Sequence, residues 1–265
     1  MTSLSCSQVG GAMLSPVTAA RFDEFGPIEI GPTHRVFVLT GAGISAESGV
    51  RTFRDANGLW EQYRVETVAS PEGWAADPGL VWRFYSQRRA QVETVSPNAA
   101  HVALAALEKR LGDRLFLCTQ NVDPLHERAG STRVWHMHGE LLKSRCENES
   151  PCGRAPIEDH RLYESVDAIA RCECGARLRP HIVWFGEVPF FMDEIARAIA
   201  SCDVFVTIGS SGAVYPAAGF VRAARARPDV RTVYVGPEIP DNAHAFDECR
   251  LGKATEVVPS LFEVG

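Results

Sequence analysis

The sequence lacks an apolar run of the roughly 20 residues that a helix needs to cross a membrane. It also lacks an excess of positive charge, because 27 Lys and Arg stand against 33 Asp and Glu, a formal net charge of -6. A negatively charged chain is not drawn to nucleic acid or to an anionic membrane by bulk electrostatics, although a local basic groove stays compatible with this balance. We therefore expect neither nucleic acid nor a membrane as a partner.

The sequence also lacks the dense cysteines of a small secreted disulfide scaffold. Four of its eight cysteines fall in one polar segment, a distribution that suits a metal site better. We therefore expect a reducing, cytoplasmic compartment. Residues 1–30 contain Arg21 as their only cation and are expected to form a flexible N-terminal extension, with mitochondrial import as an alternative.

Apolar runs typical of buried strands alternate with helical patterns along the 265 residues. This alternation predicts an α/β fold, a Rossmann-like doubly wound parallel sheet that carries a smaller domain. Ser96 and Pro97 indicate the start of a helix that lies between the strands predicted at residues 36–39 and 115–118. We expect residues 179–187 to return to the large sheet and residues 231–235 to be its last strand. The runs that predict the other strands are residues 36–39, 115–118 and 204–208.

A glycine-rich turn follows the apolar run of residues 36–39. Gly41, Gly43 and Ala46 fit the G-x-G-x-x-G/A pattern of dinucleotide-binding turns, with Ala42 inside the turn. Glycines let amide groups approach a diphosphate, and Ser45 belongs to a short helix whose N-terminus favours an anion. The alternative interpretation is a tight strand-to-helix turn without a ligand.

A dehydrogenase of this pattern would end its second strand in an acidic residue about 20 positions further on. That place is residues 58–61, which do not read as a strand end. Instead, Phe53 and Arg54 return an aromatic ring and a guanidinium toward the turn. The pattern therefore favours chemistry on the dinucleotide itself over hydride transfer.

Polar residues follow two other predicted strands, at the edge where open α/β sheets bind ligands. They can orient a ribose or a carboxamide, or contact a phosphate, although capping of the following helix is an alternative for the first group. The two groups are Gln120, Asn121 and Asp123, and Gly209, Ser210 and Ser211.

Two histidines and four cysteines are candidates for chemistry between residues 134 and 178. Either His136 or His138 could bind a metal, but a general base is the better interpretation for one of them, because the thiols provide a complete ligand set. We expect the thiols to hold a structural Zn²⁺ tetrahedrally, although their C-x5-C and C-x-C spacings depart from C-x2-C. The four ligands are Cys146, Cys152, Cys172 and Cys174.

Tyr85 and Arg88 share one side of a helix expected over residues 80–92. Spacing alone favours a tyrosine in the core with a solvated arginine beside it.

Five motifs, in order, resemble the sirtuin family of NAD-dependent protein-lysine deacylases over residues 34–236: GAGISAESGVRTFR, TQNVDPLH, HMHGELLK, RPHIVWFGE and GSSGAVYPAAG. Tyr85 and Arg88, within FYSQRR, resemble the Tyr-x-x-Arg pair of class III sirtuins, which remove succinyl and malonyl groups. The resemblance therefore favours binding of the acyl group by Tyr85 and Arg88 over the interpretation from spacing alone. Two departures are Pro124, where the family usually has Gly or Asn, and Gly236, where an Asn often contacts the adenine ribose.

The resemblance also implies a division of the chain and a role for each motif. A Rossmann-like domain would comprise residues 31–54, 96–143 and 179–265, and a small domain would combine a helical module, residues 55–95, with a zinc module, residues 144–178. His138 would be the catalytic base, acting with Asn121 and Asp123. NAD would contact Gly41, Ala42, Gly43, Ser45, Ala46, Phe53, Arg54, Gln120, Asn121, Asp123, Gly209, Ser210 and Ser211. Substrate would contact Tyr85 and Arg88, and its backbone would pair as an added strand with Val183, Trp184 and Phe185.

The implied reaction consumes NAD and an acylated-lysine protein and releases nicotinamide and O-acyl-ADP-ribose. Acidic acyl groups would be preferred. An ordinary deacetylase and a non-catalytic NAD-sensing module stay open as alternatives, and the sequence does not indicate the oligomeric state.

Overall fold

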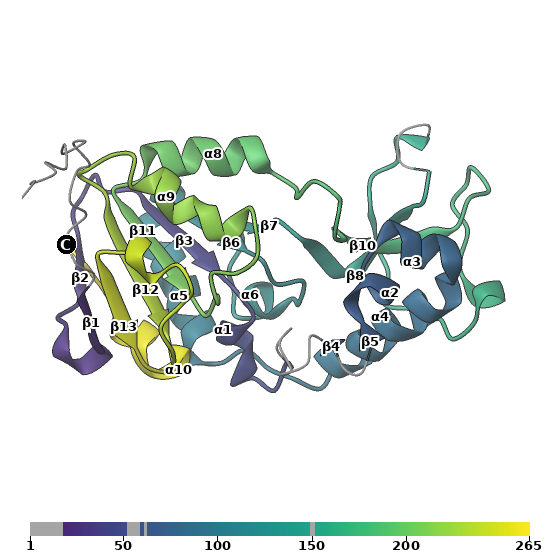
Figure 1. Cartoon of the computed structure of the whole chain (residues 1–265), viewed down its shortest axis with the longest axis horizontal. Coiled ribbons are helices and arrows are strands. Elements are labelled where there is room, and N and C mark those ends of the chain that lie inside the picture. The colour runs from purple at the N-terminus through teal and green to yellow at the C-terminus, as the bar shows by residue number, and fades with distance from the viewer. Residues whose placement is uncertain (1–17, 52–58, 61–62, 149–151) are drawn as a thin grey trace, which may run out of the picture.

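The computed structural model describes residues 18–51, 59–60, 63–148 and 152–265. A larger lobe built on an extended sheet stands beside a smaller lobe of helices and a small sheet (Figure 1). None of the helices in these residues is both long and apolar enough to cross a membrane. The architecture confirms the predicted fold class.

The large sheet has seven strands, and every neighbouring pair is parallel. One of its inner strands pairs Val38 with Val206 on one side and with Leu117 on the other. Helices cover both faces of such a sheet, so its central strands read as continuous apolar runs. The strands in spatial order are β1 (Thr18–Arg21), β13 (Glu248–Leu251), β12 (Arg231–Gly236), β11 (Val204–Ile208), β3 (Val36–Thr40), β6 (Leu115–Thr119) and β7 (Val134–His136).

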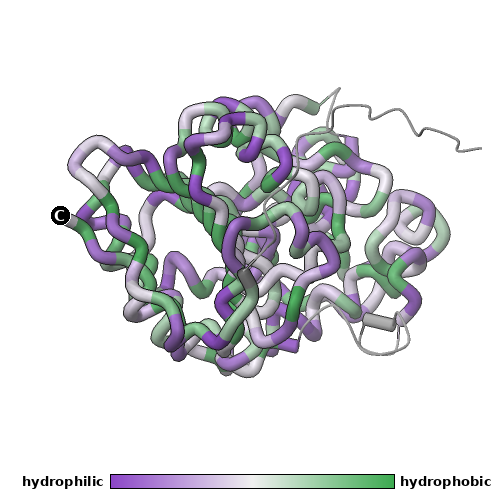
Figure 2. The backbone as a smooth tube through the Cα atoms, turned by 60° about the vertical axis from the view of Figure 1, so that its left-hand side comes forward, coloured by the Kyte–Doolittle hydropathy of each residue, from purple (hydrophilic) through white to green (hydrophobic). Residues whose placement is uncertain are grey.

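Two hydrophobic layers enclose this sheet. In β3, Val36 and Val38 face the layer that contains α5 (Ala99–Leu111) and α10 (Ala254–Val257). Phe37 and Leu39 face the opposite layer, with α8 (Met192–Ser201) and α9 (Phe220–Ala224). Figure 2 shows hydrophobic stretches running through the interior of this lobe. The alternation of side chains along β3 therefore places a core on each face.

Helix α5 begins later than predicted. Its N-cap is Asn98, whose side-chain oxygen accepts hydrogen bonds from the amides of Ala100 and His101 at 3.0 and 3.4 Å. Ser96 and Pro97 lie before this cap, in the connecting loop. The predicted start is wrong because asparagine satisfies the first free amides of the helix here.

The small lobe contains an antiparallel sheet in the order β10-β8-β9. The prediction that residues 179–187 return to the large sheet is wrong, because Leu178 in β10 pairs with Cys146 in β8. This sheet takes in residues 139–143 and 179–182, which the sequence-based division assigned to the large domain; the division itself stays a prediction. The elements of this lobe are β4 (Leu59–Trp60), β5 (Tyr63–Arg64), α2 (Val65–Val68), α3 (Pro71–Ala76), α4 (Pro78–Val92), β8 (Gly139–Cys146), β9 (Ile157–Glu158) and β10 (Leu178–Ile182).

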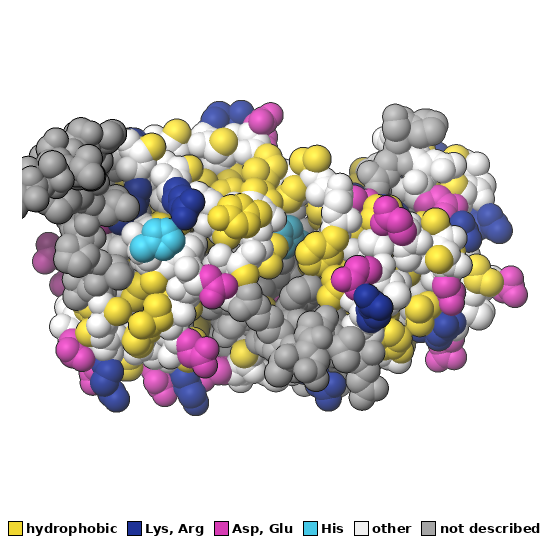
Figure 3. Space-filling model, viewed as in Figure 1, with side chains coloured by type: hydrophobic (Ala, Val, Ile, Leu, Met, Phe, Trp, Pro, Cys, Tyr) yellow, Lys and Arg dark blue, Asp and Glu magenta, His cyan; other side chains and the backbone are white. Residues whose placement is uncertain are grey.

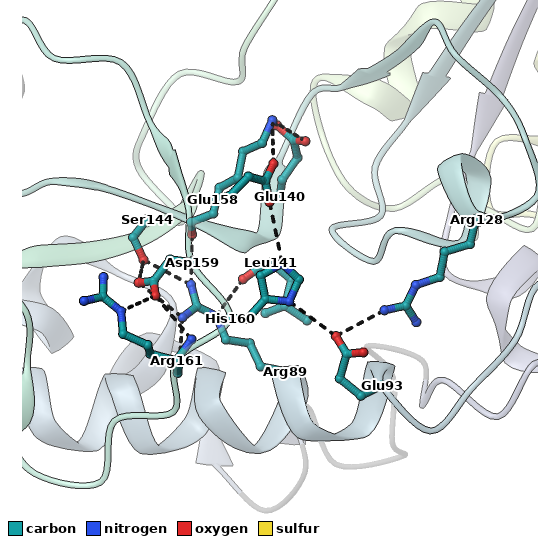
Figure 4. A network of polar contacts seen from close by, with 11 residues as sticks. Arg89, Glu93, Arg128, Glu140, Leu141, Ser144, Glu158, Asp159, His160 and Arg161 are labelled. Carbon is teal, nitrogen blue, oxygen red and sulfur yellow. Dashed lines mark hydrogen bonds and ion pairs between the residues drawn. The ribbon is translucent and has the colours of Figure 1, made fainter.

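A buried ion pair ties α4 to this sheet (Figure 4). The Arg89 guanidinium, 1% exposed, lies 3.5 Å from the Asp159 carboxylate and donates to the Leu141 carbonyl at 2.8 Å. Asp159 also accepts hydrogen bonds from Ser144 at 2.6 Å and Tyr163 at 3.0 Å. A buried charge pair with its hydrogen bonds satisfied has one favourable geometry, so α4 is held in place on β8.

The two ends of the described chain lie side by side. Strand β2 (Ile28–Ile30) pairs with β14 (Phe262–Val264), and β1 pairs with β13. Residues 18–21 and 28–30 therefore pair in sheets, within the segment expected to be a flexible extension. Residues 1–17 lie outside the described residues, and the extension stays a prediction. The expected last strand, residues 231–235, is followed by β13 and β14.

Candidate active site

A cleft of about 680 Å³ lies between the two lobes. On the face shown in Figure 3, hydrophobic side chains gather around the hollow in the middle of the molecule. Ser45 and Ala46 do not line this cleft, and Phe53 and Arg54 lie outside the described residues. The predicted site residues that do line it are Gly41, Ala42, Gly43, Tyr85, Arg88, Gln120, Asn121, Asp123, His138, Val183, Trp184, Phe185, Gly209, Ser210 and Ser211.

The two glycine turns pack backbone against backbone at the carboxyl edge of the sheet. The Gly43 amide donates to the Gly209 carbonyl at 2.8 Å. A Cβ at Gly41 would lie 2.8 Å from that carbonyl oxygen, and a Cβ at Gly43 would lie 2.7 Å from the Gly209 Cα. Gly209 itself has a φ of 65°. The glycines are therefore required by the close approach of the two turns.

Helix α1 (Gly43–Ala46) spans a single turn. The macrodipole of so short a segment is small, so the predicted attraction of a helix N-terminus for an anion is weaker than expected.

Ser45 lies behind the cleft wall and connects two of the predicted residues. Its hydroxyl accepts a hydrogen bond from the Asn121 amide at 3.1 Å and bonds to the Asp123 carboxylate. The Nε2 atom of His101 lies 3.4 Å from the same hydroxyl. Burial raises the pKa of Asp123. Sequence reasoning missed His101, because a single histidine on an apolar helix face gives no signal.

His138 lies in the turn between β7 and β8, on the wall of the cleft. Its Nδ1 atom is 3.1 Å from the Gln120 carbonyl oxygen, a partner that can only accept. Nδ1 therefore carries the hydrogen, and Nε2 has a lone pair. Burial lowers the pKa of His138 below its ordinary value, so the imidazole is neutral at pH 7. This imidazole can accept a proton at Nε2.

His136 differs from His138 although the two are separated by a single residue. Its Nδ1 bonds to the Asn121 carbonyl at 2.9 Å and its Nε2 lies 2.8 Å from the Glu127 carboxylate. Burial lowers its pKa, but Glu127, together with the Asn121 carbonyl and the charge of Glu140, outweighs burial, and the pKa is raised. Both ring nitrogens of His136 have partners, so it supports the backbone of Asn121.

Tyr85 and Arg88 lie on the side of α4 that faces the cleft. Tyr85 is fully buried and Arg88 is 6% exposed, so the solvated arginine expected from spacing alone is wrong. The indole N–H of Trp184, which can only donate, bonds to the Tyr85 hydroxyl at 3.1 Å. Arg179 lies over the Trp184 ring at 3.4 Å. These contacts hold the tyrosine in a single position.

The segment predicted to pair with substrate, residues 183–185, leaves β10 and follows the cleft. Its three amide hydrogens are already used: Val183 donates to His138, Trp184 to Glu187 and Phe185 to Ala69. A peptide strand added here would therefore have to be bound without these donors. The Phe185 side chain is 50% exposed.

The four predicted cysteines come together at the far end of the small sheet. Their Sγ atoms all lie within 4.8 Å of one another, with Cys146–Cys174 and Cys152–Cys172 each at 3.5 Å. Zinc with four thiolates at about 2.3 Å places the sulfurs about 3.8 Å apart. The cluster fits a structural zinc ion. The pairing of β8 with β10 joins the thiols, so the irregular spacings do not prevent it.

Protein purified without chelators should contain one zinc ion per chain by elemental analysis. Cys172→Ser should lower the zinc content and the melting temperature together, because metal binding supplies folding free energy to such modules. Cys202→Ser is the matched control, since that thiol lies in the large core. A folded wild-type protein without metal would contradict the assignment.

The comparisons with known proteins agree with this geometry. The Sir2 family profile matches residues 41–216. The chain is 54% identical over 233 residues to a Pasteurella multocida (strain Pm70) protein named NAD-dependent protein deacylase, a match that covers 85% of this chain and 95% of that protein. An Escherichia coli (strain K12) protein of the same name is 53% identical over 231 residues, 86% of this chain and 81% of that protein.

Solved structures match the fold over most of the chain. A Sir2 homolog–NAD complex is 38% identical with a TM-score of 0.76, covering 86% of this chain and 88% of that chain. A mutant Sir2 homologue bound to ADP ribose is 37% identical with a TM-score of 0.77, covering 86% and 91%. The resemblance read from the motifs is confirmed: the chain belongs to the Sir2 family, the sirtuins.

Proposed function

We propose that this protein is an NAD-dependent protein-lysine deacylase that prefers acidic acyl groups such as succinyl and malonyl. The observation that carries the proposal is a neutral His138 whose Nδ1–H is bound by the Gln120 carbonyl, on the wall of a cleft shared by both lobes. The names of the relatives in Pasteurella and Escherichia support the general activity. The acyl preference is supported by Tyr85 and Arg88.

The cleft has the features that NAD requires. Gly41, Gly43 and Gly209 line the cleft where their two turns meet, and because they carry no side chains a diphosphate could approach the backbone there. Gln120 donates to the Ser210 hydroxyl at 3.0 Å, which orders the wall beside it. When bound, NAD supplies a ribose carbon activated by its nicotinamide leaving group.

Two residues of this chain, His138 and Asn121, would lie at the reacting ribose. His138 would accept a proton from a ribose hydroxyl at Nε2, which a neutral imidazole can do near pH 7. Asn121 is oriented by its hydrogen bond to Ser45 and by the His136 bond to its carbonyl. Both residues therefore stand ready before substrate binds, which avoids the cost of ordering them during the reaction.

The acyl preference follows from the charges at the small-lobe side of the cleft. Arg88 brings a buried guanidinium to the wall, and a carboxylate on the acyl chain would form a charge-assisted hydrogen bond with it. Glu187 also lines the cleft, but Arg179 and Arg145 pair with it at 2.6 and 3.2 Å. Its negative charge is therefore balanced and would repel an acidic acyl group only weakly.

The test compares one peptide carrying succinyl-, malonyl- or acetyl-lysine, with nicotinamide release measured at saturating NAD. We expect kcat/KM for succinyl and malonyl to exceed that for acetyl by about 10- to 100-fold, the range expected for a hydrogen bond to a charged group. Equal values would favour an ordinary deacetylase. No nicotinamide release with any peptide would favour a non-catalytic NAD-binding protein.

A further inference from the structure

The last residues of β12 form an unusual pair at the carboxyl edge of the sheet. Tyr234 and Gly236 share the face opposite Val233 and Val235, and the tyrosine ring lies along the strand over the glycine. A Cβ at Gly236 would lie 2.2 Å from the Tyr234 hydroxyl oxygen and 2.7 Å from its Cζ. The Gly236 backbone does not have a positive φ. The position therefore uses the absence of a side chain, and the tyrosine hydroxyl occupies the space that a side chain would take.

The Tyr234 hydroxyl is available to a ligand. The residue lines the cleft, although it is only 4% exposed and its ring packs 5.7 Å from the Phe246 ring. No hydrogen bond to this hydroxyl is formed within residues 18–51, 59–60, 63–148 and 152–265. Burial raises the pKa of Tyr234 to about 12, so the group keeps its proton and can donate as well as accept.

The strand order indicates which part of a dinucleotide would reach this hydroxyl. Asn121 and Asp123 follow β6, whereas Tyr234 lies in β12, separated from β6 by β3 and β11. Neighbouring strands lie about 4.8 Å apart, so the two places are about 14 Å apart across the sheet. The Gly209 amide, which donates to the Val235 carbonyl at 2.8 Å, lies between them. A dinucleotide with its nicotinamide at β6 and its diphosphate at the glycine turns therefore extends its adenosine to β12.

We propose that the Tyr234 hydroxyl, which occupies the space beside Gly236, hydrogen-bonds a hydroxyl of the adenosine ribose. The inference rests on the proposed function, because it takes NAD as the ligand and the nicotinamide end at Asn121. It assigns to this chain a binding group on the strand itself, in place of a side chain at position 236.

The experiment measures ADP-ribose binding by isothermal titration calorimetry, without peptide and without turnover. Tyr234→Phe should raise Kd about 2- to 10-fold, the effect of one uncharged hydrogen bond. The same titrations are made with ADP-ribose analogues that lack the 2′- or the 3′-hydroxyl of the adenosine ribose, so that the loss of the tyrosine hydroxyl and the loss of the ribose hydroxyl can be compared. One of them should bind the wild type more weakly by the same factor and should bind Tyr234→Phe no more weakly than intact ADP-ribose, since the same contact is then already missing.

Gly236→Ala provides a second variant that tests the geometry. The added Cβ should displace the Tyr234 phenol, so Gly236→Ala should have a higher Kd for ADP-ribose than the wild type. In a protein that already carries Tyr234→Ala, adding Gly236→Ala should change Kd little. In kinetics, Tyr234→Phe should raise KM for NAD and leave kcat unchanged, because the contact is remote from the reacting carbon. An unchanged Kd in Tyr234→Phe, or additive losses with both analogues, would overturn the inference alone. A wild-type protein that does not bind ADP-ribose would overturn the proposed function together with it.

Discussion

Replacing His138 by alanine should lower kcat for succinyl-peptide deacylation by about 10²- to 10⁴-fold, the usual loss when a general base is removed. The imidazole lines the cleft and bonds to the Gln120 carbonyl through Nδ1, so its removal deletes the proton acceptor without opening the core. The melting temperature and the Kd for ADP-ribose should therefore change little. Activity within threefold of the wild type at saturating NAD and peptide would refute the assignment.

The matched control is His160→Ala, because His160 is exposed and lies outside the cleft. The wild-type pH profile provides an independent check. A base acts in its neutral form, so activity falls as the pH drops through the pKa of His138. Burial lowers that pKa, and the acid limb of kcat/KM should therefore lie below pH 6.5 and be absent from the residual activity of His138→Ala.

Replacing Arg88 by methionine should lower the ratio of succinyl to acetyl kcat/KM by about 10- to 100-fold. A charged hydrogen bond to the acyl carboxylate contributes about 1.5–3 kcal/mol, and methionine keeps most of the volume while removing the charge. The acetyl group has no carboxylate to pair with a guanidinium, so acetyl-peptide turnover should change far less. The measurement is the two kcat/KM values in each protein, with the same peptide sequence.

Arg83→Met is the control on the same helix. The Arg83 side chain is 43% exposed and lies 3.8 Å from Asp77, outside the cleft. It should leave both substrates unchanged. If Arg88→Met lowers succinyl and acetyl turnover by equal factors, then Arg88 supports the fold or NAD binding, and the acidic-acyl preference loses its basis.

Local patterns in the sequence were sufficient for the central strands of the large sheet and for the family. Apart from Thr207, residues 36–39, 115–118 and 204–208 are all apolar, because both faces of a central parallel strand are buried. A pattern of this kind can be recognised in a short stretch of sequence. The shorter β13, with Glu248 and Arg250 among its four residues, gave no such signal. The cysteine cluster was also predictable, because four cysteines in one polar segment are suited to binding a metal even when their spacings are irregular.

Pairing over long distances decided the rest, because it depends on which segments pack together. His136 and His138 are equivalent by sequence, and only the contacts with Glu127 and Gln120 separate a supporting histidine from one with a lone pair on the cleft. Likewise, helical spacing put Tyr85 and Arg88 on one face without indicating that the face is buried. Tyr234 gave no functional signal, because its proposed role depends on its hydroxyl taking the place of a side chain at Gly236 and on the position of β12 in the strand order. The periodicity of the side chains thus determined which segments form helices and strands. The burial and the hydrogen-bond partners of the site residues determined their chemistry, and these exist only after the lobes have packed.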